Sequence, residues 1–168
     1  MFGVSGAGKT TACAKLAQRH HAFHHISASQ LVDRADVSPD RSIVQASATQ
    51  TEIVERLRYV MENEARRVLL DGHCVIRLAT GLFPVPNEFL VALSPARIIL
   101  IEAEPETVWN RRNQSELTTK VAKLEEIAEE LWLTRKTCVA YHRNLSIPLK
   151  VLNSGASDLA DELFSCLT

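Results

Sequence analysis

The sequence has no strong excess of charge of either sign. Its 168 residues carry a formal net charge of -1, with 23% charged and 46% hydrophobic residues. So balanced a charge argues against the basic surface of nucleic-acid-binding proteins, and the composition is ordinary for a globular protein. Any anionic ligand must therefore be held by a local site.

Long apolar segments are absent as well. Every apolar run is far shorter than the roughly 20 residues that a membrane span requires. The N-terminus also lacks the basic stretch, followed by an apolar stretch, that marks a secretory signal. We expect a soluble protein that is not secreted.

The cysteines form no C-x-x-C pair. The four of them are Cys13, Cys74, Cys138 and Cys166. This spacing matches neither a zinc ribbon nor a dithiol redox motif. We expect reduced thiols in a cytoplasmic protein.

A group of histidines also lacks the partners that a metal site needs. They are His20, His21, His24 and His25. Two of them could chelate an ion if the backbone brought them together, but no cysteine or aspartate close by completes the ligand set. We expect exposed histidines at a helix end and a strand start.

Short segments of strand type alternate with longer segments of helical periodicity. The strand candidates are 24–26, 68–71, 98–101 and 149–152, and the helical candidates are 9–20, 48–65, 104–113, 119–143 and 156–167. Prolines at 84 and 86 predict a loop. Continuous apolar strands are typical of parallel sheets covered on both faces. The pattern predicts a single domain with a three-layer α/β fold, in which ligands bind at the carboxyl ends of the strands.

A glycine-rich segment near the N-terminus matches the phosphate-binding pattern G-x-x-x-x-G-K-[ST]. The residues expected to hold phosphates are Gly3, Ser5, Gly6, Ala7, Gly8, Lys9, Thr10 and Thr11. Glycines let backbone N–H groups turn toward phosphate oxygens, and the helix that follows adds its positive end. Lys9 is expected to reach the β- and γ-phosphates and Thr10 to bind magnesium. The alternative is a glycine-rich turn that merely caps a helix.

The buried strand that should precede this P-loop is nearly absent. Only Met1 and Phe2 stand before Gly3. Either the first strand is very short, or some residues upstream are missing from the chain.

A polar group follows the apolar strand at 68–70. Asp71 stands where a carboxylate would hold magnesium directly or through water, and His73 is a candidate substrate contact. The alternative for Asp71 is an aspartate that caps a turn between strand and loop.

The long helical segment at 119–143 carries an arginine within its apolar stripe. Arg135 lies about 20° from Leu124 around the helix axis, so we expect its guanidinium to point inward, where it needs an anion. A structural ion pair with a glutamate, or a side chain that reaches outward, is the alternative. Four glutamates are expected on the solvated face of the same helix; they are Glu125, Glu126, Glu129 and Glu130.

Two further arginines end the preceding helix. Arg112 follows Val108 by four residues and shares its face, with Arg111 alongside. Planar guanidiniums suit the oxygens of a phosphoryl group in transfer. We predict catalytic roles for Lys9, Arg112 and Arg135 and nucleotide binding by Arg111, although a solvated surface position for Arg111 is an equal alternative.

In their order along the chain, these features resemble the archaeal-type adenylate kinases and their small P-loop kinase relatives. The resemblance covers nearly the whole chain. It rests on segments 3–11, 68–73 and 93–103, on the Arg111–Arg112 pair and on Thr134–Arg135.

The resemblance implies a five-stranded parallel sheet, ATP with Mg²⁺ as phosphoryl donor, and a nucleoside monophosphate as acceptor. Residues 27–50 would line the acceptor pocket, with Arg41 as a phosphate contact, and residues 111–122 would form a reduced lid. Relatives carry arginines soon after the arginine pair, whereas segment 113–120 of this chain offers only Lys120. This departure favours a second hypothesis: an ATP-binding regulatory module that hydrolyses slowly or not at all and acts through a protein partner.

Overall fold

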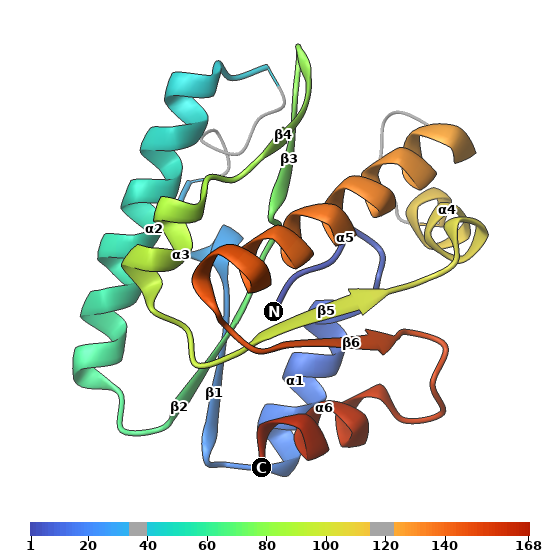
Figure 1. Ribbon diagram of the computed structural model, residues 1–168. Coiled ribbons are helices and arrows are strands. Elements are labelled where there is room, and N and C mark those ends of the chain that lie inside the picture. The colour runs from blue at the N-terminus through green and yellow to red at the C-terminus, as the bar shows by residue number, and fades with distance from the viewer. Residues whose placement is uncertain (34–39, 115–122) are drawn as a thin grey trace.

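The fold is described from a computed structural model, which covers residues 1–33, 40–114 and 123–168. Four strands form two parallel pairs (Figure 1). Strand β1 (Phe23–Ser27) pairs with β2 (Arg67–Asp71), and β5 (Ile98–Glu102) pairs with β6 (Leu149–Asn153). These are the four strands predicted from the sequence. The first four residues of β5 are all buried, which explains why its sequence is apolar without interruption.

The segment before the P-loop lies between the two pairs. The Met1 amino group donates to the Leu70 carbonyl oxygen at 2.5 Å, and the Gly72 N–H donates to the Met1 carbonyl oxygen at 3.0 Å. On the other side, the Phe2 N–H donates to the Ile99 carbonyl oxygen and the Ile101 N–H donates to that of Phe2, both at 2.8 Å. The expected fifth strand is therefore a two-residue segment with one isolated bridge, Phe2 to Leu100.

The described residues form six α-helices, and all but α3 lie close to the five positions predicted from the sequence. They are α1 (Lys9–Arg19), α2 (Ile43–Asn63), α3 (Asn87–Leu93), α4 (Pro105–Asn113), α5 (Leu124–Leu145) and α6 (Leu159–Leu167). Helix α2 begins five residues before its predicted start, because Ser42 and Gln45 form a capping box in which each side chain accepts from the backbone N–H of the other. Residues 119–122 of the predicted long helix lie outside the described chain.

An antiparallel hairpin that the sequence did not predict precedes the proline loop. Strands β3 (Val75–Leu78) and β4 (Gly81–Pro84) pair with each other, and the hairpin rises beside α2 (Figure 1). Ile76 and Leu78 pack with Ala46 of α2 and with Val85. The two strands have four residues each, too few for a clear periodic pattern, so the hairpin was missed, whereas residues 85 and 86 after it do form the predicted loop.

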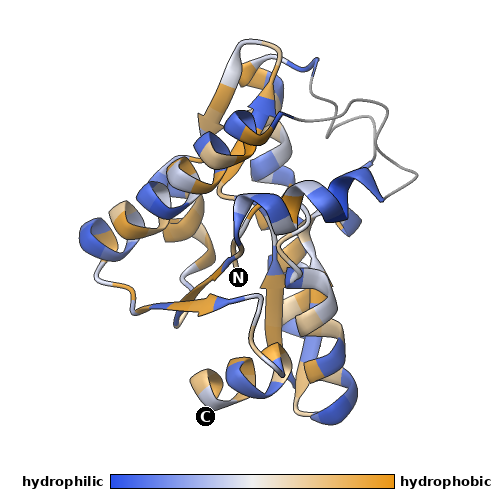
Figure 2. Ribbon diagram, turned by 90° about the vertical axis from the view of Figure 1, so that its right-hand side faces the viewer, coloured by the Kyte–Doolittle hydropathy of each residue, from blue (hydrophilic) through white to orange (hydrophobic). Residues whose placement is uncertain are grey.

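Helices cover both faces of the parallel strands. Ile99 and Ile101 pack with Leu16 of α1 and Leu163 of α6, whereas Ile98 and Leu100 pack with Leu90 of α3 and Tyr141 of α5. Successive residues of a strand point to opposite faces, so β5 supplies both cores of a three-layer arrangement. Figure 2 shows mostly hydrophobic strands and helices that carry both kinds of residue. Among the described residues, no helix has the length and apolar character to cross a membrane.

Candidate functional site

A large cleft opens at the carboxyl end of β2, beside the first turn of α1. Its volume is about 1170 Å³. Its lining comes from the P-loop, the ends of β1 and β2, strand β3, the segment after β6 and residues of each of the helices α1 to α6. The predicted site residues that line it are Ser5, Gly6, Gly8, Lys9, Thr10, Thr11, Arg41, Asp71, His73, Arg111 and Arg112.

The P-loop backbone has the conformation that its glycines permit. Gly6 and Gly8 adopt φ angles of 83° and 95°, a left-handed region that strains residues with a side chain. Gly8 is the N-cap of α1, and no described side chain caps that helix end. The first N–H groups of α1 are thus available to an anion in the cleft, where the helix dipole favours negative charge.

Lys9 is buried beneath the loop. Only 5% of the residue is exposed, and its Nζ donates to the Val4 carbonyl oxygen at 3.0 Å. Burial lowers the pKa of Lys9 to about 8, although the carboxylates of Asp71 and Glu130 act in the opposite direction. An anionic ligand next to this ammonium would compensate the cost of burying its charge.

Thr10 and Asp71 meet at the bottom of the cleft. The Thr10 hydroxyl donates to Asp71 Oδ1 at 3.4 Å, and the Ser27 hydroxyl donates to the same oxygen at 3.3 Å. Burial alone would raise the pKa of Asp71, but the hydrogen bond and charge of His25, with the nearby Lys9, outweigh burial and lower it. A carboxylate beside a hydroxyl is an oxygen donor set that suits Mg²⁺.

His25 contradicts the prediction of exposed histidines. Its side chain is only 13% exposed, and Nε2 lies 2.5 Å from Asp71 Oδ2. His25 pairs with Leu69 in the β1–β2 register, and Asp71, two residues further on, shares the same face of the sheet. The sequence separates the two residues by 46 positions, so only the strand register could have revealed the contact.

Both arginines of α4 contact the P-loop. Arg112 Nε donates to the Ser5 carbonyl oxygen at 2.9 Å, and Arg111 Nη1 donates to that of Gly6 at 3.0 Å. The other nitrogens of Arg112 bind the two carboxylate oxygens of Glu130 at 3.0 and 3.1 Å. The bidentate pair holds the Arg112 guanidinium against the phosphate loop.

Glu130 is buried in the cleft wall, and its predicted place on the solvated face is wrong. The residue is only 8% exposed. Besides Arg112 it pairs with Arg77 of β3, whose Nη2 lies 3.5 Å from Oε2. Arg77 was missed in the sequence because it lies within an apolar strand that the sequence did not predict.

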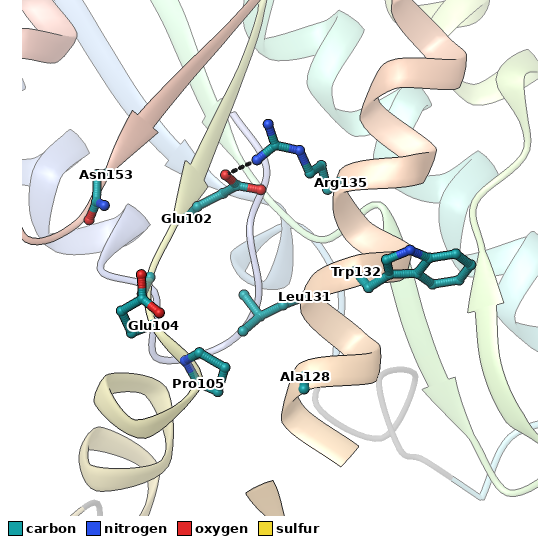
Figure 3. A pocket seen from close by; sticks show the side chains of 9 residues that line it. Glu102, Glu104, Pro105, Ala128, Leu131, Trp132, Arg135 and Asn153 are labelled. Carbon is teal, nitrogen blue, oxygen red and sulfur yellow. Dashed lines mark hydrogen bonds and ion pairs between the residues drawn. The ribbon is translucent and has the colours of Figure 1, made fainter. Parts of the chain in front are cut away.

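Arg135 does not point inward, contrary to the prediction. Its side chain is 57% exposed and forms an ion pair with Glu102 (Figure 3). The buried residues of α5 include Ile127, Thr134, Cys138 and Tyr141, a stripe about one residue, or 100°, away from the predicted one.

The Arg135–Glu102 pair belongs to a separate, smaller cavity of about 280 Å³ between α5 and the start of α4. Arg135 does not line the P-loop cleft. The alternative weighed from the sequence, a structural ion pair, is the arrangement observed.

The two predicted substrate contacts lie in the cleft. Arg41 stands just before α2, and His73 lies beyond the end of β2. His73 is exposed to the open cleft, yet the crowding of cleft atoms around its imidazole and the charge of Lys9 lower its pKa. Residues 34–39 of the expected acceptor segment and 115–122 of the expected lid lie outside the described chain.

Comparison with known proteins agrees with this geometry. The AAA domain family matches residues 2–128. The adenylate kinase of Methanopyrus kandleri is 24% identical over 166 residues, which cover 90% of this chain and 86% of the relative. That of Thermococcus kodakarensis is 25% identical over 182 residues, covering 98% and 92%.

Two solved structures share the fold. A gluconokinase from Sinorhizobium meliloti has a TM-score of 0.63 and 11% identity, and the match covers 99% of this chain and 88% of that one. The deoxyadenosine kinase of M. mycoides with bound dATP has the same score and identity, with 99% and 96% covered. The expected α/β P-loop kinase fold and the resemblance to archaeal adenylate kinases are therefore confirmed.

Proposed function

The chain belongs to the AAA domain family, and on that premise we propose that it is a phosphotransferase that moves the γ-phosphoryl group of ATP to a nucleoside monophosphate. The observation that carries the proposal is a single cleft lined by five cationic side chains that come from different elements. Lys9, Arg111 and Arg112 come from the P-loop and α4 and Arg41 from just before α2, while Arg77 of β3 reaches the same Glu130 carboxylate as Arg112. A kinase needs such an arrangement, because it must hold two phosphorylated reactants facing each other.

The P-loop side suits the donor. The open N-terminus of α1 and the Lys9 ammonium would bind the β- and γ-phosphates, and Thr10 and Asp71 would hold Mg²⁺. Bound there, magnesium would neutralise charge that develops on the transferred group. Arg112, fixed against the loop, would contact that group in the transition state, where a planar guanidinium matches its oxygens.

The part of the cleft lined by α2, the hairpin and α3 suits an acceptor with a phosphate and an apolar ring. Arg41 and Arg77 would pair with the phosphate, Ile53 and Phe89 offer apolar surface, and Gln50 can hydrogen-bond a base edge. His73, between the two sides, would contact the acceptor. We propose one kinase-like domain, with residues 27–50 on the acceptor side and 111–122 as a reduced lid.

Nucleotide binding is tested by thermal unfolding with and without Mg·ATP. A ligand at 100 times its Kd stabilises a protein by about 2.7 kcal/mol, which in a domain of this size raises Tm by roughly 5 to 10 °C. We expect Lys9→Ala to remove most of this shift, and Lys150→Ala, at an exposed position of β6, to keep it. An unchanged Tm at millimolar Mg·ATP in the unaltered protein would exclude the proposal.

A second candidate function has its own support. Arg112 forms a bidentate pair with Glu130, and a guanidinium held by a carboxylate is less available to a phosphoryl group. An ATP-binding module with little turnover, acting through a protein partner, would tolerate this arrangement. The distinguishing observation is whether an acceptor accelerates ADP formation.

A further inference from the structure

Three metal-binding side chains of different chemistry converge below the P-loop. Cys13 of α1, His25 of β1 and Asp71 of β2 place a sulfur, a nitrogen and an oxygen atom within 4.8 Å of one another. We call these residues the thiol triad. Their elements are far apart in the sequence, so the fold alone brings them together.

We propose that the thiol triad binds a thiophilic divalent cation such as Zn²⁺ or Cd²⁺. Three protein ligands of types S, N and O, with a fourth position open, make a donor set that zinc accepts, whereas magnesium avoids sulfur. The Met1 Sδ lies 4.0 Å from Cys13 Sγ and is a soft neighbour for the open position. The sequence analysis disfavoured a metal site at the histidine group because no cysteine or aspartate stands close to it along the chain.

The geometry needs little adjustment to accept an ion. His25 Nε2 and Asp71 Oδ2 lie 2.5 Å apart, within hydrogen-bond distance. Two bonds of about 2.0 Å at a tetrahedral angle would place these atoms about 3.3 Å apart, so the pair must open by less than about 1 Å. The ion would bind the Nε2 lone pair, so the proton of the His25–Asp71 hydrogen bond would move to His25 Nδ1 or leave to solvent, and the Cys13 thiol would release its proton to solvent as the metal–sulfur bond forms.

The two oxygens of Asp71 separate this site from the proposed magnesium position. Oδ1 accepts from Thr10 and Ser27 in the cleft, whereas Oδ2 contacts His25. A soft ion on Oδ2 would draw charge from the carboxylate and repel a second dication on Oδ1. Occupancy of the thiol triad is therefore expected to weaken Mg·ATP binding.

Cadmium titration of the purified protein tests the proposal through the ultraviolet charge-transfer band of the Cd–thiolate bond. Burial raises the pKa of Cys13 to about 12, so the metal-free thiol contributes no thiolate absorbance of its own. We expect a band that saturates at one equivalent, is lost in Cys13→Ser and persists in Cys166→Ser. His25→Gln should weaken cadmium binding by at least tenfold.

A second thiol group requires its own control. Cys74 Sγ and Cys138 Sγ are both buried and lie 3.6 Å apart. A band that persists in Cys13→Ser but disappears in Cys138→Ala would overturn the proposal, as would the absence of any band. Thermal unfolding of Cys13→Ser without metal establishes that the variant is folded.

The metal proposal and the proposed function can fail separately. The Tm shift caused by Mg·ATP, measured in metal-free buffer, tests nucleotide binding without any soft ion. If the triad is occupied as proposed, one equivalent of cadmium should raise the Kd for Mg·ATP, and Cys13→Ser should abolish that effect. Equal Mg·ATP affinity with and without bound cadmium would refute the coupling.

Discussion

Two arginines predicted to share one catalytic role have different surroundings. Arg112 is buried against the P-loop, with 12% of its side chain exposed, whereas Arg135 is 57% exposed and paired with Glu102. The Arg112 guanidinium is preorganised within the cleft, and that of Arg135 stands outside it. Preorganised charge at the reacting group contributes most to catalysis.

We therefore expect Arg112→Ala to reduce phosphoryl transfer by two orders of magnitude or more, while Arg135→Ala leaves the rate within a few-fold. An exposed ion pair contributes about 1 kcal/mol or less, so Arg135→Ala should also unfold at nearly the same urea concentration as the parent. Single-turnover kinetics with the best acceptor measure the first effect, and urea denaturation measures the second.

The reverse result would restore the orientation expected from the sequence. If Arg135→Ala loses transfer while Mg·ATP affinity is unchanged, the Arg135–Glu102 pair must open during the reaction. Arg135→Lys distinguishes an ion pair from a phosphoryl contact, because lysine keeps the positive charge but loses the planar guanidinium that a bidentate phosphate contact needs.

Residue-level prediction succeeded where the chemistry is local and failed where partners come from other elements. The P-loop was recognised because its glycines, Lys9 and Thr10 are contiguous, and Asp71 because it ends an apolar strand. His25 and Glu130 were misjudged because their partners, Asp71 and Arg112, lie 46 and 18 residues away. A displacement of the buried stripe by about 100° was enough to leave Arg135 exposed and Glu130 buried.

At the scale of elements, Glu130 connects three of them. Its carboxylate on α5 binds Arg112 of α4 and approaches Arg77 of β3. Removing one partner of a buried pair leaves an uncompensated charge and costs about 3 to 5 kcal/mol. We expect Glu130→Gln to lower the free energy of unfolding by an amount in this range, measured by urea denaturation.

Saturating Mg·ATP should reduce that deficit if the γ-phosphate takes the place of Glu130 beside Arg112. The same linkage predicts a lower Kd for Mg·ATP in Glu130→Gln than in the parent protein. Glu129→Gln, at the exposed neighbouring position, should change neither quantity. A deficit of equal size with and without nucleotide would show that Arg112 does not engage the phosphates.

A second connection between elements is a single buried hydroxyl. Tyr141 of α5 is 1% exposed and donates to the Val85 carbonyl oxygen, between the hairpin and α3, at 2.5 Å. Tyr141→Phe leaves this acceptor unpaired, which costs about 1 to 3 kcal/mol. Urea denaturation should show this loss, whereas Tyr59→Phe, at a residue 71% exposed, should not. Equal stability of the two variants would contradict the role assigned to this hydrogen bond.

The order of elements was more predictable than the arrangement of the hairpin. Periodicity located the parallel strands and the helices, because these are long enough to repeat an apolar pattern. The hairpin has only four-residue strands, and the prolines at its end obscured it. Arg77 comes from this hairpin and was therefore missed. The residues of the proposed acceptor side were predicted only in part.

At the scale of the whole molecule, the cleft divides between two parts of the chain. The donor side is formed by segments at the carboxyl ends of the parallel strands, where α/β folds bind ligands. The proposed acceptor side consists of α2, the hairpin and α3, which stand on one flank of the parallel strands (Figure 1). Acceptor choice should therefore depend on the second part and donor binding on the first.

An acceptor screen tests this division and the proposed function together. With Mg·ATP and each of AMP, GMP, CMP, UMP and the free nucleosides, ADP formation should rise at least tenfold above the acceptor-free rate for one or more monophosphates. Nucleosides should give no comparable increase, because they lack the phosphate that Arg41 and Arg77 would bind.

Arg41→Ala should raise KM for the preferred monophosphate by tenfold or more and leave KM for ATP nearly unchanged, since the two nucleotides would occupy different parts of the cleft. If no acceptor accelerates ADP formation, the kinase proposal is rejected and the regulatory module is favoured. If a free nucleoside gives the highest rate, the proposed phosphate contacts of Arg41 and Arg77 are wrong.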